Sequence, residues 1–338
     1  MRVPTRLLIG AVGVVAAAGV LAGCGGAGSS GTQAPPAGAE GAGCAPVTGN
    51  QLVVLDDDKK LQNTDNVIPA INSKVAQPPL VAALDKVSDS LDTPKLIGLN
   101  KAVDADRKTS KVAAEEFAAA NNLTAGITGG GSGEIVIGAA NFSENATLAE
   151  LYRIALTAAG YQPRVQQIGN RELYEPALEK GQIQVVPEYA ASMAEFLNNK
   201  LNQQPGGATP PPVASPDLNQ TVSGLKTLGD KAGITFGKPS AAQDQNAFAV
   251  TKEFADKYGV RTLSELAAKC SGTATVLAGP PECPQRQTCQ AGLVRVYNFQ
   301  AGRFSSFDAG GPQTKSAVKR GEASVGLVLS SDGELAAG

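Results

Sequence analysis

Residues 134–189, EIVIGAANFSENATLAELYRIALTAAGYQPRVQQIGNRELYEPALEKGQIQVVPEY, decide the fold of this chain. Short apolar runs alternate there with segments whose apolar residues recur at helical spacing, and Gly160 and Gly181 follow those segments as helix C-caps do. Parallel strands need such helical crossovers, and ligands bind at the carboxyl ends of their strands. We therefore predict a β-α-β-α-β unit with strands at 134–138, 164–168 and 182–186 and helices at 146–159 and 172–180.

Polar turns follow the first and third predicted strands, NFSE at 141–144 and PEYAAS at 187–192. They resemble the NF(T/S)E and PEYTGT turns of the substrate-binding proteins of osmoprotectant ABC transporters, the glycine betaine/choline-binding family. The resemblance implies an α/β, two-lobed type II periplasmic-binding-protein fold. It also implies that both turns face one ligand crevice, with an aromatic ligand residue in the second.

The order of the matching segments differs from that of the family. Residues 51–125, which contain LDDDK at 55–59, resemble the family's C-terminal part, whereas residues 134–238 resemble its N-terminal part. A glycine-rich linker at 126–133 joins the two, and SSDG at 330–333 resembles the turn that leads into the LDDDK strand in the family.

From this order we predict a circularly permuted fold in which Gly338 and Gln51 lie close together. Lobe one would comprise residues 51–238 and lobe two residues 239–338, with a single covalent crossing near Ser240.

The N-terminus has the pattern of a bacterial lipoprotein signal. Two arginines precede an apolar run, and Leu-Ala-Gly stands directly before Cys24. The run is shorter than the roughly 20 apolar residues that a membrane-spanning helix needs. We expect residues 1–23 to be a signal peptide, Cys24 to be lipidated and residues 24–50 to form a flexible tether. The protein would be extracytoplasmic, anchored to the outer face of the cytoplasmic membrane.

Composition narrows the classes of function. The net charge is −2 and no long basic run occurs, which argues against a nucleic-acid partner. Histidine is absent, which removes the commonest general base and metal ligand. We expect a monomer that is not an enzyme and that uses neither a metal nor another cofactor.

Four cysteines follow Cys24, namely Cys44, Cys270, Cys283 and Cys289. An even number in an exported protein favours disulfides, and the lack of a CxxC pair argues against zinc. Three pairings are possible. The short spacing favours Cys283 with Cys289, which leaves Cys44 for Cys270, a bridge that would give the lobes a second tether.

The resemblance also implies a ligand site, a cage of aromatic faces around a quaternary ammonium. Tyr189 keeps a cage tyrosine, Phe248 replaces a second one, Ser192 keeps a hydroxyl and Arg286 keeps the arginine that binds a ligand carboxylate. The implied ligand-binding set is Asp65, Asn141, Phe142, Ser143, Tyr189, Ser192, Asn246, Phe248, Arg286 and Leu329.

The cage also departs from the family. Leu329 and Asp65 stand where two further cage tyrosines are expected, and Ala140 stands in place of a lysine. Asp65 could supply an opposite charge to a cation.

The leading hypothesis is a lipid-anchored binding protein that captures a small osmoprotectant of the glycine betaine or choline type by lobe closure. It would deliver this small-molecule ligand to an ABC permease. The depleted cage favours an alternative, the same fold binding another polar solute such as a sugar or polyol. An enzyme that uses Glu188 and Asp65, or a sensory or structural lipoprotein, are further alternatives.

Overall fold

The computed structural model describes residues 32–33, 41–202 and 210–335 of the 338-residue chain. The predicted signal peptide, Cys24 and most of the predicted tether lie outside these ranges. All described residues belong to one compact unit, residues 31–338.

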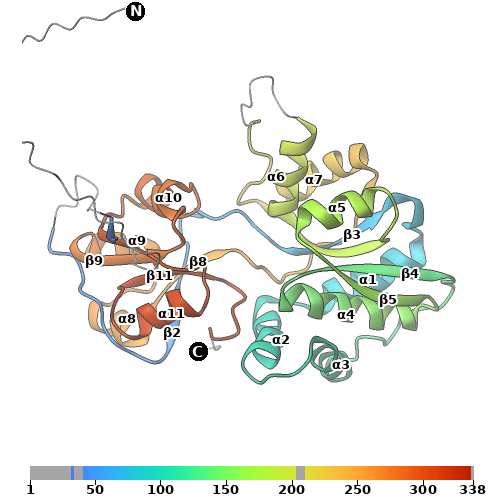
Figure 1. The fold of residues 1–338 in the computed structure, drawn as a ribbon, viewed down its shortest axis with the longest axis horizontal. Helices are drawn as coiled ribbons and strands as arrows, with labels where there is room; N and C mark the ends of the chain where they lie inside the picture. The colour runs from blue at the N-terminus through green and yellow to red at the C-terminus, as the bar shows by residue number, and fades with distance from the viewer. Residues whose placement is uncertain (1–31, 34–40, 203–209, 336–338) are drawn as a thin grey trace, which may run out of the picture. The chain divides into compact units, whose positions relative to one another are not determined.

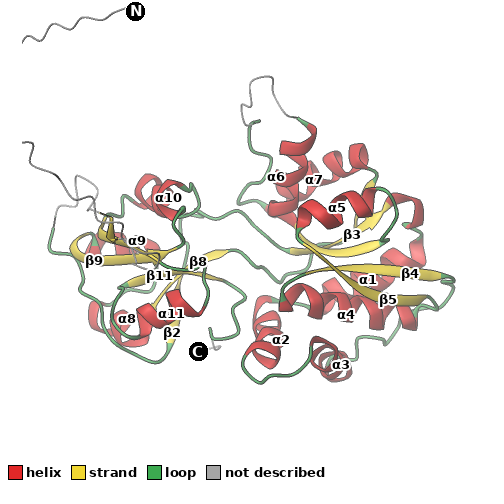
Figure 2. Cartoon of the chain, in the orientation of Figure 1, coloured by secondary structure: helices red, strands yellow, loops and turns green. Residues whose placement is uncertain are grey.

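The described residues form two mixed sheets (Figure 2). The first sheet has the strand order β5-β4-β6-β3-β7 and the second the order β1-β10-β9-β11-β8-β2. The strands of the first sheet are β3 (Val67–Asn72), β4 (Glu134–Ala140), β5 (Gln162–Gly169), β6 (Val185–Tyr189) and β7 (Ile234–Phe236). Those of the second are β1 (Thr32–Gln33), β2 (Leu52–Leu55), β8 (Asn246–Thr251), β9 (Gly272–Gly279), β10 (Ala301–Ser306) and β11 (Val325–Leu329).

The predicted β-α-β-α-β unit is present in the first sheet. Strand β4 pairs in parallel with β5 and with β6, and helices α4 (Ser143–Ala158) and α5 (Arg171–Glu179) make the crossovers. Gly160 follows α4 with a φ of 98°, a left-handed conformation that favours glycine. The carboxyl ends of β4 and β6 therefore meet at one edge of the sheet, as expected.

Helices cover both faces of the first sheet (Figure 1). In β4, Ile135 and Ile137 pack on one side and Val136 and Ala140 on the other, because neighbouring side chains of a strand point to opposite faces. One face carries α1 (Pro78–Ser90), α2 (Thr93–Asp104), α3 (Ser110–Ala120) and α4, and the other carries α5, α6 (Ala190–Leu201) and α7 (Leu218–Ala232). A 3-10 helix, η1 (Ser73–Val75), follows β3.

Shorter helices accompany the second sheet. They are α8 (Lys252–Tyr258), α9 (Leu263–Cys270), α10 (Gln290–Gly292) and α11 (Pro312–Lys319), with the single-turn helices η2 (Cys283–Gln285) and η3 (Leu293–Tyr297). None of the helices in the described ranges is both long and apolar enough to cross a membrane.

The lobe boundaries differ from the prediction. Strand β2 pairs antiparallel with β8 and so belongs to the second sheet, although residues 51–238 were all assigned to lobe one. The chain passes to the first sheet through residues 56–66 and returns through residues 237–245. The single crossing near Ser240 is therefore wrong, because two segments join the sheets. They are bonded to each other, for example from the Asp244 amide to the Asp65 carbonyl oxygen at 3.0 Å.

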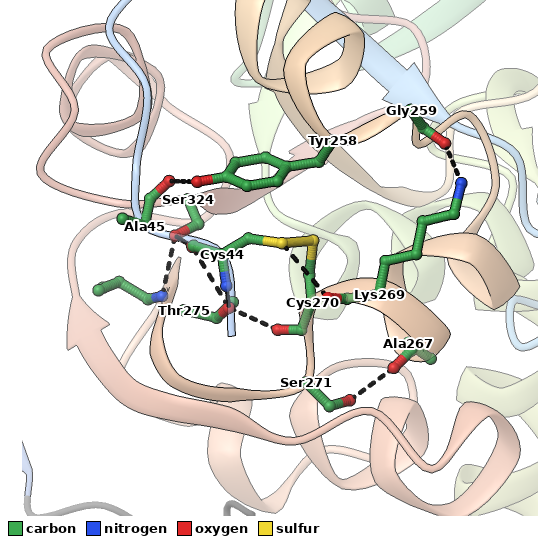
Figure 3. The surroundings of a disulfide bond; sticks show 11 residues. Cys44, Ala45, Tyr258, Gly259, Ala267, Lys269, Cys270, Ser271, Thr275 and Ser324 are labelled. Carbon is green, nitrogen blue, oxygen red and sulfur yellow. Dashed lines mark hydrogen bonds between the residues drawn. A yellow bond between two sulfur atoms is a disulfide. The ribbon is translucent and has the colours of Figure 1, made fainter. Parts of the chain in front are cut away.

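Residues 41–50 are attached to the second sheet and do not behave as the predicted tether. Ala42 forms a bridge with Gly272, and the buried Cys44 amide donates to Thr275 Oγ1 at 2.7 Å (Figure 3). The Ser324 hydroxyl donates to the Cys44 carbonyl oxygen at 2.9 Å. These contacts fix the segment because they satisfy its buried backbone groups.

Both disulfides have the predicted pairing, Cys44 with Cys270 and Cys283 with Cys289. The first does not tether two lobes, however. Cys44 and Cys270 pack in the same core, so the bridge fastens the N-terminal segment to the second sheet.

The circular permutation stays a prediction. Gly338 lies outside the described residues, but Leu335 and Leu52 share one buried cluster beside the second sheet. The end of the described chain is therefore packed with its first long strand.

We expect the double substitution C44S and C270S to lower the free energy of unfolding by about 2–4 kcal/mol, since the bridge closes a loop of 226 residues. The control variant, C283S with C289S, opens a loop of only 6 residues and should lose less. Guanidinium unfolding measures both. A free Cys44 thiol in non-reducing peptide mapping would contradict the bridge.

Candidate functional site

A cavity of about 590 Å³ lies where the turns of the first sheet face residues carried by the second sheet. Most of its lining residues are polar, and they carry both signs of charge. Three aromatic side chains line it, Phe142, Tyr174 and Tyr189, together with six carboxamides, Gln62, Asn63, Asn141, Asn170, Gln245 and Asn246. The charged residues of the lining are Asp65, Arg171, Glu195, Asp244 and Arg286.

Asn145 brings the two predicted turns together. This fully buried residue stands in the first turn of α4. Its Oδ1 accepts a hydrogen bond from the Ala140 amide at 2.8 Å, and its Nδ2 donates to the Pro187 carbonyl oxygen at 2.9 Å. One carboxamide thus joins the ends of β4 and β6, which places Asn141, Phe142 and Tyr189 on one wall.

Two aromatic rings stand side by side on this wall. The centroids of Phe142 and Tyr189 are 6.3 Å apart, and the ring planes differ by 29°. The Tyr189 hydroxyl donates to Glu144 Oε1 at 2.6 Å, so it is engaged inside the protein. Burial, and next the charge of Glu144, raise the pKa of Tyr189 well above its usual value. Phe142 is 44% exposed and presents its ring to the cavity.

Behind the same wall, the buried Glu188 forms an ion pair with Arg171. Arg171 holds its carboxylate with two hydrogen bonds, Nε to Oε1 at 3.0 Å and Nη2 to Oε2 at 2.7 Å. The Tyr174 hydroxyl donates to Oε1 at 2.8 Å. Glu188 is itself fully buried and does not line the cavity, so these bonds hold Arg171 and Tyr174 in place beside it.

Sequence reasoning missed Arg171 and Tyr174 as residues of the cavity. The signal was present, because the two stand three positions apart in a segment predicted to be helical and so share one helix face. What the sequence did not show is that this face turns toward Glu188.

Asp65 and Ser192 both line the cavity, but they are bonded to each other. Asp65 Oδ1 accepts from the amides of Ala191 at 2.8 Å and Ser192 at 3.0 Å, and Oδ2 accepts from the Ser192 hydroxyl. Asp65 therefore caps the N-terminus of α6. Burial raises its pKa to about 6, although these hydrogen bonds act in the opposite direction.

Three of the predicted ligand residues, Asn246, Arg286 and Leu329, line the cavity from the side of the second sheet. Asn246 begins β8, Leu329 ends β11, and Arg286 lies in the loop that the Cys283–Cys289 disulfide closes. The Arg286 side chain is 55% exposed, and its Nη2 lies 2.9 Å from Glu282 Oε1.

Phe248 is not on the wall of this cavity, which corrects the expectation. It is 1% exposed and packs in the core of the second sheet. Side chains two positions apart in a strand point to the same face, so Asn246 and Phe248 share one face of β8. Asn246 starts the strand beside the cavity, and Phe248 lies two residues further along it, inside the core.

Ser143, the remaining predicted residue, lines a neighbouring cavity of about 360 Å³. This second cavity shares Phe142, Asp244 and Leu329 with the first one. Its other charged residues are Asp104, Glu144, Lys315, Asp332 and Glu334.

No group of His, Cys, Asp and Glu side chains among the described residues is arranged to hold a metal ion.

Comparison with proteins of known structure gives distant matches. A putative peptide-binding protein, AppA from Clostridium difficile, is 10% identical, with 60% of this chain and 48% of that chain covered and a TM-score of 0.29. The binding protein AgaA from A. tumefaciens R10, in complex with agropinic acid, is 13% identical, with 56% and 45% covered and a TM-score of 0.26. The chain thus spans about half the length of these proteins. No curated protein matches it.

A family model matches most of the chain. Residues 46–120 and 133–337 fit the substrate-binding domain of ABC-type glycine betaine transport systems. The interval between the two matched segments contains most of the glycine-rich linker at 126–133. The chain therefore belongs to this family of ABC-transporter substrate-binding domains. Its two β-sheets, each with its helices, form the two lobes of the family's periplasmic-binding-protein fold.

Proposed function

We propose that this protein is the solute-binding component of an ABC importer and captures a small osmoprotectant of the glycine betaine or choline type. As a monomer it would bind the solute in the 590 Å³ cavity and present it to a permease in the membrane. The observation that carries the proposal is the wall that Asn145 builds from the family's two characteristic turns, with Phe142 and Tyr189 side by side on it.

Each end of such a solute has a suitable partner. A quaternary ammonium on the face of the Phe142 ring would gain about 2 kcal/mol from cation-π attraction once desolvated. A carboxylate would pair with Arg286, whose only ion pair in the described part of the chain is with the exposed Glu282. Arg171 is less available, because Glu188 occupies two of its donors.

Closure is the functional event in this proposal. The cavity takes residues from both lobes, and residues 56–66 and 237–245 are the two segments that join them. A ligand that contacts both walls stabilises the closed arrangement over the open one by its contacts to the second wall.

Another polar solute, such as a sugar or polyol, is a second candidate. Six carboxamides line the cavity, and each can both donate to and accept from a hydroxyl group. The position of Phe248 in the core also leaves fewer aromatic faces for a cation than the family pattern implies. Calorimetry with glycine betaine, choline, carnitine and proline, run beside sorbitol and glucose, separates the two candidates.

The substitution F142A should weaken choline binding by about 5- to 30-fold, because it removes the exposed aromatic face of the cavity. Leu173→Ala is the matched control, since Leu173 is also a large exposed apolar residue but does not line either cavity. Isothermal titration calorimetry measures both variants. Equal losses of choline affinity in the two variants would show that Phe142 does not contact the ligand.

The substitution R286Q should weaken glycine betaine binding by roughly tenfold or more, the effect of losing a charge-assisted hydrogen bond. Choline has no carboxylate, so its affinity should change little. The same titrations provide the measurement, with choline as the internal control. A similar loss for both ligands would mean that Arg286 acts on the shape of the loop and not on the carboxylate.

We infer, in addition, that lipidation of Cys24 anchors the mature protein to the outer face of the cytoplasmic membrane. The pattern before Cys24 supports this inference. In a bacterial host that processes lipoproteins, C24S should move the protein from the membrane fraction to the soluble fraction. Mass spectrometry of the N-terminal peptide would contradict the anchor if it found Cys24 unmodified in the wild type.

A further inference from the structure

The two cavities of the cleft meet at three residues, Phe142, Asp244 and Leu329, which line both. Phe142 and Leu329 are among the few large apolar side chains that remain exposed, the latter at 38%. Asp244 lies in the returning segment between the lobes. An acidic group therefore stands beside two uncovered apolar surfaces at the junction.

Negative charge exceeds positive charge around this junction. Five carboxylates line the second cavity, Asp104, Glu144, Asp244, Asp332 and Glu334, against one cation, Lys315. Lys315 Nζ is already paired with Asp332 Oδ2 at 2.7 Å and with Glu334 Oε1 at 3.0 Å. Within the described part of the chain, Asp104, Glu144 and Asp244 form no ion pair.

Glu144 and Asp244 are held by neutral donors only. The Asn100 Nδ2 atom donates to Glu144 Oε2 at 2.5 Å and to the Ser331 carbonyl oxygen at 2.8 Å. The Ser331 hydroxyl donates to Asp244 Oδ1 at 2.8 Å. Burial raises the pKa of both carboxyls, and the charge of Glu144 raises that of Asp244 further.

Asn100 provides an independent sign that a hydrogen-bond donor is missing from the second cavity. The residue is 5% exposed and lines this cavity, yet its Oδ1 accepts no hydrogen bond from the described residues. A buried acceptor without a partner costs stability. The hydroxyl group of choline is a donor that would relieve that cost, whereas a quaternary ammonium group has no N–H to donate.

We propose that a positively charged group of the ligand binds at Asp244, between Phe142 and Leu329, and displaces to the solvent a proton held by the Asp244 and Glu144 carboxyls. The proposal rests on the importer function above and adds to it a counter-ion and a coupling to pH. It replaces Asp65 as the acidic partner of a cation, because Asp65 is engaged at the N-terminus of α6.

The sign of the coupling follows from the charges that face Asp244. They are Glu144 on α4, Asp65 on the outgoing segment and Asp332 after β11, with Lys315 on α11 paired to Asp332. An acidic neighbourhood favours the protonated form, whereas a bound cation favours the ionised form. Affinity for a cation should therefore fall as the pH falls, because protons compete for the same carboxyl.

The test uses the full mature chain and two cations without a carboxylate, choline and tetramethylammonium. Calorimetry between pH 5.5 and 8, in buffers of different ionisation enthalpy, counts the protons released. We expect release to approach one proton per cation in the acidic range, with affinity weakening up to about tenfold per pH unit there. Release of no proton at any of these pH values would overturn the proposal.

Variants assign the effect to the residue. D244N should weaken the binding of both cations by about 10- to 100-fold and abolish the proton release. The control D106N removes an exposed acid that lines neither cavity and should change neither quantity. Unchanged affinity and proton release in a folded D244N would overturn the proposal. If D244N fails to fold, the proton count of the wild type decides.

Failure of this inference is distinguishable from failure of the proposed function. If the wild type binds glycine betaine or sorbitol but neither cation, the assignment of Asp244 is overturned while solute capture stands. If none of these solutes binds, both fall.

Discussion

The site depends on one buried carboxamide. Asn145 bonds to the main chain at the ends of two parallel strands, and no other described side chain makes both contacts. Because the helix that carries Asn145 begins at Ser143, next to Phe142 on the cavity wall, local folding and assembly of the candidate site use the same residues. The rings of Phe142 and Tyr189 lie side by side next to these bonds, since Phe142 directly precedes α4 and Tyr189 ends β6.

The acids around the cleft differ in character because their partners differ. Arg171 neutralises Glu188, and the amides at the start of α6 bind Asp65. Both carboxylates have committed their acceptors to the protein. Glu144 and Asp244 receive only neutral donors, so their charge is not compensated. The same carboxyl group thus forms an ion pair at Glu188, caps a helix at Asp65 and keeps an uncompensated charge at Glu144 and Asp244.

Local patterns in the sequence predicted much of this structure. The β-α-β-α-β unit could be predicted because periodicity encodes it. The short spacing favoured the Cys283–Cys289 pair, but three pairings were possible, and Cys44–Cys270 was only the pair left over. The predicted turn at 187–192 is instead the end of β6 and the start of α6. The place of β2 could not be predicted, because its pairing with β8 spans nearly 200 residues and no local signal specifies a partner strand. The sequence also does not show how deep a residue lies along its strand. The family resemblance predicts Phe248 on the cavity wall, whereas the residue lies in the core of the second sheet.

The Cys44–Cys270 bridge has a mechanical meaning for the membrane anchor proposed at Cys24. Under the anchor proposed at Cys24, a pull from that end reaches the fold first at β1 and at the Ala42–Gly272 bridge, and at Cys44 a covalent bond carries it into α9. The load does not pass through the paired segments at 56–66 and 237–245. In the lobe closure proposed above, the first lobe would then move about those segments without pulling on the anchor.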